Sequence, residues 1–106
     1  MAWMLEFYPG VEQQILTLPP GLQARVIRLL DLMQHHGADL GPPHTDALGH
    51  GLFELRAKAQ EGIARGIFCY KRGNHIVVLH VFVKKSQKTP RQALRLALQR
   101  MNEVKT

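Results

Sequence analysis

A chain of 106 residues, 45% of them hydrophobic and 21% charged, has the length and composition of one ordinary globular domain, which excludes wholesale disorder. Its single cysteine permits no internal disulfide, and no apolar run approaches the roughly 20 residues of a membrane-spanning helix. The N-terminal residues also lack the basic flank and apolar run of a signal peptide. We therefore expect a single domain over residues 1–106 that is cytoplasmic and has no membrane partner.

The net charge of +6 is distributed unevenly along the chain. Residues 1–50 hold two Lys/Arg against five Asp/Glu, whereas residues 51–106 hold twelve against three. A basic excess concentrated in one half is expected of a face that binds a polyanion such as RNA or DNA. The alternative interpretation is a basic surface that only keeps the protein soluble.

Residues 1–51 predict one strand, two helices and a loop. Apolar and polar residues alternate over residues 3–8, which indicates a short strand that ends at Pro9-Gly10. Apolar residues at helical spacing then predict a helix over residues 11–18 and a longer one from Leu22 that stops at Gly37. These two helices form an αα-hairpin with one face to bury. Residues 37–51 are rich in Gly, Pro, His and Asp and are interpreted as a loop.

Three strands and a helix are predicted in the second half. The strands cover approximately residues 52–58, 63–71 and 75–83, and the turn signals between them indicate hairpins. Thr89 is a good N-cap and Pro90 a good first residue for a helix that continues to about Val104. The order β-α-α-β-β-β-α predicts an α+β domain. We expect its helices to cover one face of the sheet and to leave the other face open to ligand.

Strand alternation places cationic and aromatic side chains on this open face. The last strand is expected to bury one set of residues, Val77, Leu79, Val81 and Val83. The opposite side of the three strands then carries Arg56, Arg65, His80, Phe82 and Lys84. An aromatic residue among cations suits single-stranded RNA, because bases stack on the ring while Arg and Lys hold phosphates. Individually, Phe82 is also a candidate core residue, His80 a half-buried histidine, and the Glu54–Arg56 pair a minor salt bridge.

Other chemistries find little support in the sequence. Four histidines cluster in or beside one loop, His35, His36, His44 and His50, but their spacing fits no common structural zinc site. Cys69 lies inside a predicted strand, where a cysteine usually serves as a small apolar side chain. No glycine-rich loop has the spacing of a phosphate-binding motif. We therefore expect neither a metal ion nor a cofactor.

With these residues in place, the chain resembles the RelE/HigB-type toxins of the RelE–ParE superfamily, especially their phage-derived, HigB-like branch. The resemblance covers nearly the whole chain and is carried by residues 48–56, Arg65, Tyr70, residues 78–86 and Thr89-Pro90. It implies a small antiparallel sheet packed by helices. It also implies the toxin of a toxin–antitoxin pair, which cuts mRNA in the ribosomal A site. A cognate antitoxin, often with a helix-turn-helix domain, would hold it inactive.

The resemblance also implies roles for individual residues. Arg56, Arg65 and Lys84 fall on the basic positions of the concave face, with Lys85 as a less direct fourth. The arginines would stabilise charge on phosphorus. Lys84, crowded by neighbouring lysines, would accept the proton of the RNA 2′-OH, with His80 as the rival base. Further RNA contacts are assigned to four residues: Phe82, Lys58, Lys88 and Arg91.

The chain departs from the family pattern at its C-terminal end. Some RelE-type toxins have a Tyr or His there that serves in acid–base chemistry, whereas residues 101–106 of this chain contain neither. The sequence therefore leaves two candidates for the general base, Lys84 and His80. Two other functions also stay open: a non-catalytic, ParE-like toxin that inhibits gyrase, and a nucleic-acid-binding module without toxicity.

Overall fold

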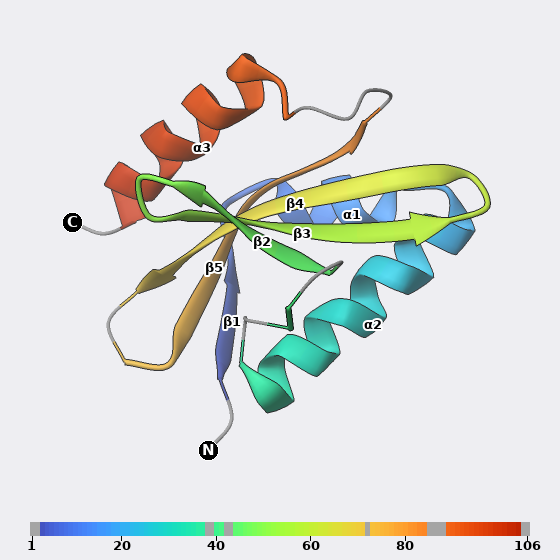
Figure 1. The fold of residues 1–106 in the computed structure, drawn as a ribbon, viewed down its shortest axis with the longest axis horizontal. Coiled ribbons are helices and arrows are strands. Elements are labelled where there is room, and N and C mark those ends of the chain that lie inside the picture. The colour runs from blue at the N-terminus through green and yellow to red at the C-terminus, as the bar shows by residue number, and fades with distance from the viewer. Residues whose placement is uncertain (1–2, 38–39, 42–43, 72, 85–88, 105–106) are drawn as a thin grey trace.

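The computed structural model describes residues 3–37, 40–41, 44–71, 73–84 and 89–104. Within them the chain forms, in order, β1 (Met4–Phe7), α1 (Val11–Leu16), α2 (Pro20–His36), β2 (Thr45–Gly49), β3 (Leu52–Ala59), β4 (Gly62–Lys71), β5 (His75–Lys84) and α3 (Arg91–Val104). The predicted α+β class is confirmed, and Figure 1 shows the helices against one twisted sheet. No helix in the described part of the chain combines the length and apolar character needed to cross a membrane.

The sheet has the strand order β1-β5-β4-β3-β2. The β3–β4 and β4–β5 pairs are antiparallel, as the predicted hairpins require. β1 pairs with β5 in parallel, so the sheet is mixed rather than purely antiparallel. The directions alternate from β2 to β5 through three antiparallel pairs, so β5 runs in the direction of β1, whereas β2, the strand that follows the two helices, runs opposite to β1.

The predicted loop over residues 37–51 contains an edge strand, β2, which pairs with β3. Its sequence Thr-Asp-Ala-Leu-Gly is poor in β-branched residues and shows no clear alternation. The turn into β3 is made by Gly49, His50 and Gly51, whose φ angles of 90°, 57° and 86° lie in the left-handed region. Two glycines are suited to such a turn, because they adopt positive φ without steric cost.

Helices cover both faces of the sheet, so the expectation that they cover one face was wrong. α1 and α2 pack on one side, where the largest core cluster includes Leu22, Leu29, Met33, Leu55 and Phe68. On the opposite side α3 packs through Ala93, Ala97 and Met101 against residues of three strands: Leu52, Ile67, Cys69, Val77 and Leu79. Figure 1 shows α2 and α3 on opposite sides of the strands. Each amphipathic helix needs an apolar partner surface, and the two sheet faces supply one each.

An irregularity in β5 changes which of its side chains share a face. Phe68 pairs with Val78 and the preceding Ile67 pairs with His80, so that Leu79 is an extra residue without a partner in β4. Such a β-bulge reverses the alternation of the strand. The four residues that were expected to share one core face are therefore divided. Val77 and Leu79 pack beneath α3, Val81 packs with the α1–α2 cluster, and Val83 is 43% exposed.

Candidate functional site

The predicted site residues lie in register across three adjacent strands. Arg65 of β4 is directly opposite Arg56 of β3 and Phe82 of β5. This central row is flanked by a row of Glu54, Ile67 and His80 and by a row of Lys58, Ile63 and Lys84. Residues directly opposite each other in a sheet project from the same face. These side chains therefore lie on a common face, as predicted. α3 partly covers the same face.

A buried carboxylate, Glu54, lies at the centre of this face with 1% of its surface exposed. Its Oε1 accepts hydrogen bonds from Arg65 Nη1 at 2.7 Å and from Arg56 Nε at 3.0 Å, and its Oε2 accepts one from the Thr89 hydroxyl. Burial alone would raise the pKa of Glu54, but the hydrogen bonds from Thr89, Arg56 and Arg65 hold it below its ordinary value. The carboxylate is thus ionised and orders both arginines.

Glu54 is the residue that sequence reasoning missed. It was interpreted only as a surface partner of Arg56, whereas it connects two strands and the segment before α3. The available signal was its position in β3, between Phe53 and Leu55 and one strand away from the buried Arg65. An acidic residue buried in a strand requires partners, because an unpaired charge in the interior is costly.

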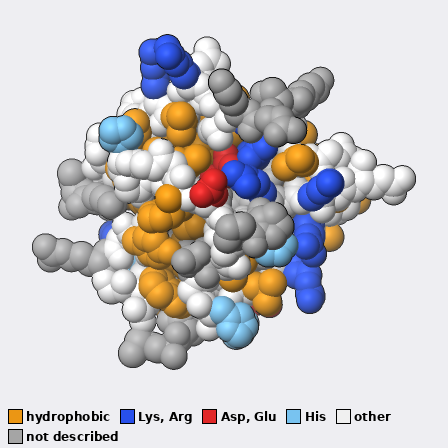
Figure 2. Space-filling view, viewed as in Figure 1, with side chains coloured by type: hydrophobic (Ala, Val, Ile, Leu, Met, Phe, Trp, Pro, Cys, Tyr) orange, Lys and Arg blue, Asp and Glu red, His pale blue; other side chains and the backbone are white. Residues whose placement is uncertain are grey.

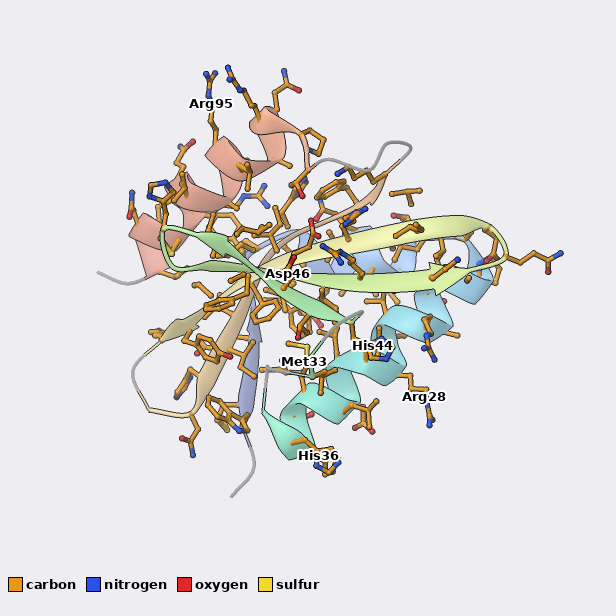
Figure 3. The ribbon with its side chains drawn as sticks, in the orientation of Figure 1. Arg28, Met33, His36, His44, Asp46 and Arg95 are labelled. Atoms are coloured by element: carbon orange, nitrogen blue, oxygen red, sulfur yellow. The ribbon has the colours of Figure 1, made fainter. Side chains whose placement is uncertain are left out.

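The two arginines differ in exposure. Arg56 is about one-third exposed, and its Nη2 also donates to Asp46 Oδ2 of β2 at 3.1 Å. Asp46 lies near the centre of the view in Figure 3, over the crossing strands. Arg65 is 6% exposed, so the expectation of a fully open face does not hold for it. Arg56 is therefore the arginine that a substrate can reach directly, with Arg65 behind it.

Lys84 is buried in the row next to the arginines and is 7% exposed. Its ammonium nitrogen has no hydrogen-bond partner among the described residues. Burial, followed by the charges of Arg65 and Arg56, lowers the pKa of Lys84, while Glu54 opposes this shift. A lysine amine with a lowered pKa can act as a base. The lowered pKa of Lys84 was expected from the sequence, but it was attributed to neighbouring lysines. In the structure its causes are burial and the two arginines.

His80 and Phe82 form a stacked pair, with ring centroids 5.0 Å apart and an interplanar angle of 24°. Both side chains are half-buried, and Phe82 also packs against the cluster beneath α3. Nδ1 of His80 has no hydrogen-bond partner within the described part of the chain. Burial and the charge of Arg100 lower the pKa of His80, so its ring is neutral at neutral pH.

Of the four remaining predicted site residues, two are exposed near the edge of this face and two lie outside the described residues. Lys58 and Arg91 are exposed, the first near the end of β3 and the second at the start of α3. Lys85 and Lys88 lie outside the described residues. Figure 2 shows acidic and basic side chains meeting near the middle of the molecule, beside hydrophobic ones. Among the described residues, no three His, Cys, Asp or Glu side chains are grouped so that they could hold a metal ion.

A separate apolar groove lies between α1, α2 and β1. It has a volume of about 290 Å³ and is lined chiefly by Leu5, Phe7, Ile15, Leu16, Ile27 and Leu30, with Glu12, Asp31 and Gln34 adding polar atoms. Leu16 and Ile27 are 61% and 50% exposed, which is unusual for large apolar side chains. Contiguous exposed apolar surface of this kind often marks a site of protein interaction.

Comparisons with known proteins agree with this architecture. Residues 13–102 match the family model of the phage-derived protein Gp49-like family (DUF891). No curated protein matches the chain. Among solved structures, the free Escherichia coli toxin RelE, as a mutant with two arginines changed to alanine, superposes with a TM-score of 0.70 at 11% identity, covering 95% of this chain and 99% of that one.

Two toxin–antitoxin complexes are also similar. The archaeal RelE–RelB complex of Pyrococcus horikoshii gives a TM-score of 0.60 at 16% identity, covering 82% of this chain and all of the matched chain. The RelBE2 complex of Mycobacterium tuberculosis gives 0.58 at 16% identity, with 79% of this chain and all of the other covered. At such identities the matches show a common fold. The resemblance drawn from the sequence is confirmed: the chain belongs to the phage-derived Gp49-like family and has the fold of RelE.

Proposed function

We propose that this protein is the toxin of a toxin–antitoxin module and acts as an endoribonuclease on mRNA, with the RNA 2′-OH as nucleophile. The family, the RelE fold and the basic second half of the chain support this proposal. The observation that carries it is the buried amine of Lys84, which has no partner among the described residues and shares a face with Arg56 and Arg65. A face that only bound phosphate would not require a buried amine whose pKa is lowered.

In the proposed reaction the scissile phosphate binds against Arg56, with Arg65 behind it. Guanidinium groups match phosphate oxygens, and preorganised cations commonly contribute about 10²–10³-fold to a rate. The ion pairs with Glu54 fix both arginines before substrate binds, so that little reorganisation is needed. The arginines thus stabilise the negative charge that develops on the phosphate oxygens in the transition state, and this task needs no metal ion.

The proton transfer completes the chemistry. Lys84 Nζ accepts the proton of the 2′-OH, the 2′ oxygen bonds to phosphorus, and the bond from phosphorus to the 5′ oxygen breaks. The departing 5′ oxygen takes up a proton from solvent, so the products are a 2′,3′-cyclic phosphate and a 5′-OH end. A positioned general base contributes about 10²–10⁴-fold. His80 is the alternative base, since its ring is neutral and its Nδ1 has no partner among the described residues.

The stacked rings of Phe82 and His80 suit a nucleotide base of the substrate. Stacking on an aromatic side chain is worth about 1–3 kcal/mol per base and tolerates different bases. Lys58 and Arg91 add exposed positive charge near this face, and Lys88 is proposed to do the same. We propose that the natural substrate is mRNA on the ribosome in the cytoplasm. A small face of this kind contacts few nucleotides, so it binds free RNA weakly without the ribosome.

The proposed partner is a small cognate antitoxin, of the helix-turn-helix type. Two of the similar structures are complexes of a RelE-type protein with its antitoxin. The apolar groove beside Leu16 and Ile27 offers a surface for the apolar side of an amphipathic segment. An acidic part of the same antitoxin would meet the basic face and speed association at low salt.

The proposal is tested by incubating the purified chain with mRNA-programmed ribosomes and by analysing the ends of the fragments. Cleavage with 5′-OH and 2′,3′-cyclic phosphate ends supports it. Intact mRNA, together with inhibited DNA supercoiling by gyrase, selects the ParE-like function. Binding without either effect leaves a nucleic-acid-binding module.

A further inference from the structure

The bulge in β5 determines which side chains reach the candidate site. In a regular strand His80 would share its side with Val78, which packs with the α1–α2 core. The extra residue, Leu79, shifts the alternation by one. His80, Phe82 and Lys84 consequently project from the same face as Arg65, while Val77 and Leu79 stay beneath α3. Loss of the bulge would turn the three site residues toward the opposite core.

A bulge interrupts the ladder of backbone hydrogen bonds, so the groups around it need other partners. The carbonyl of Val78 accepts from the backbone N–H of Tyr8 at 2.9 Å, which continues the pairing with β1. The backbone N–H of Val81 donates to Oε1 of Gln14 at 3.2 Å. The carbonyl of Leu79 accepts from Nη1 of Arg100, a side chain of α3, at 2.6 Å.

Arg100 is itself held in place by Tyr8, which is hydrogen-bonded in turn to Glu103. Its guanidinium carbon lies 4.5 Å from the centroid of the Tyr8 ring, in the geometry of a cation–π contact. The hydroxyl of Tyr8 donates to Glu103, one turn further along α3. A charged donor to a backbone carbonyl makes one of the stronger hydrogen bonds available to a protein. The bond to Leu79 is therefore both strong and preorganised.

We propose that Arg100 is a positioning residue of the candidate site, because it holds the bulge that turns His80, Phe82 and Lys84 onto the face of Arg56 and Arg65. The proposal rests on the proposed nuclease function for its consequence in catalysis. The geometric part, that Arg100 maintains the bulge and the setting of His80, stands without it. Arg100 touches no predicted substrate position and acts only through Leu79 and His80.

The charge of Arg100 also affects a measurable quantity, the pKa of His80. After burial, this charge is the cause that lowers the pKa of His80. Among the described residues, the ionisable groups of the same face are Glu54, Arg56, Lys58, Arg65 and Lys84, and, further along the strands, Glu6, Cys69, Lys71 and His75. Substitution of Arg100 by Gln should therefore raise the pKa of His80. A purely structural role of Arg100 in fixing α3 would not specifically change the titration of this ring.

The experiment compares wild type with Arg100→Gln and Arg100→Lys, and with Arg95→Gln as the matched control. Arg95 is exposed on the same helix, and its side chain points away from the sheet in Figure 3. NMR titration of the His80 ring and the amide shifts of residues 78–81 report on the bulge. Ribosome-dependent cleavage is measured in parallel, and thermal unfolding verifies that each variant is folded.

We expect Arg100→Gln to raise the pKa of His80 toward the ordinary value of about 6.5, to shift the amides around Leu79, and to lower cleavage on the order of 10²-fold. Arg100→Lys should keep most of the pKa depression, and Arg95→Gln should match wild type. An unchanged His80 titration and unchanged amide shifts in folded Arg100→Gln would overturn the proposal. If wild type does not cleave RNA, the proposed function fails, and the NMR comparison still decides the role of Arg100.

Discussion

Arg65 Nη1 donates a hydrogen bond of 2.7 Å to Oε1 of Glu54, and both side chains are almost completely buried. The same oxygen accepts a hydrogen bond from Arg56. One carboxylate thus orders two guanidinium groups on adjacent strands, while the buried Lys84 of the third strand has no such partner among the described residues. This arrangement fixes two guanidinium groups beside a buried amine that no described residue pairs.

Replacement of Glu54 by Gln is expected to destabilise the fold by about 3 kcal/mol, because removal of one partner leaves a buried charge uncompensated. Urea denaturation measures the change in the free energy of unfolding. Asp46→Asn is the control: Asp46 also pairs with Arg56, but its side chain is 57% exposed, and such pairs contribute at most about 1 kcal/mol. Equal losses in the two variants would show that Glu54 has no special structural role.

The stability of the protein should also depend on pH through Glu54. Its pKa is lower in the folded protein than in the unfolded chain, so the folded state binds fewer protons in this range. The stabilisation is therefore present above the unfolded carboxyl pKa of about 4.3 and is lost as the pH falls through the folded pKa. Unfolding free energies of wild type and Glu54→Gln, measured at successive pH values, should converge on acidification; curves that stay parallel contradict this.

The pH dependence of cleavage distinguishes the two candidate bases. If Lys84 accepts the proton, the rate rises with pH up to the pKa of Lys84, which lies below the ordinary lysine value of about 10.4, and is constant above it. Lys84→Ala should lose this rising limb of the pH–rate profile. If His80 is the base, the limb lies below about 6.5 because the pKa of His80 is lowered. Lys58→Ala, in the same sheet row but exposed, should keep the wild-type profile.

The apolar groove gives a prediction for the partner. Ile27→Asp places a charge on an exposed apolar residue of α2 that lines the groove, and it should weaken antitoxin binding by at least about 10-fold, since burying an unpaired charge costs more than 1.4 kcal/mol. Ala24→Asp, on an exposed position of the same helix outside the groove, is the control. Titration calorimetry with the protein encoded by the adjacent reading frame measures both affinities. Equal affinities would place the antitoxin elsewhere.

Much of the fold followed from the sequence because periodicity and turn residues were strong. α2 ends at His36, directly before Gly37, whose φ of 92° suits glycine, and α3 ends at Val104, as predicted. The edge strand β2 was missed, since Thr45–Gly49 carries no alternation and owes its form to pairing with β3. The Gly49-His50-Gly51 turn was the signal available.

The common face of the candidate residues was predicted in part, for a similar reason. Alternation placed Arg56 and Arg65 on one face, because β3 and β4 pair without interruption along this stretch. The residues of β5 joined them only through the bulge at Leu79, and a bulge depends on contacts such as that of Arg100, which is distant in sequence. Glu54 escaped notice because its burial depends on Thr89 and Arg65 closing over it in three dimensions.

The most direct test of the proposed nuclease is induction of the chain in a bacterium, followed by mapping of mRNA 5′ ends. Arg56→Ala provides the comparison, since Arg56 is partly exposed and its loss should lower cleavage by about 10²–10³-fold with the protein still folded. We predict new 5′-OH ends within coding regions on induction of wild type and their near absence with Arg56→Ala. Growth arrest with intact mRNA, or the same ends in both strains, would contradict the assignment of this face as a ribonuclease site.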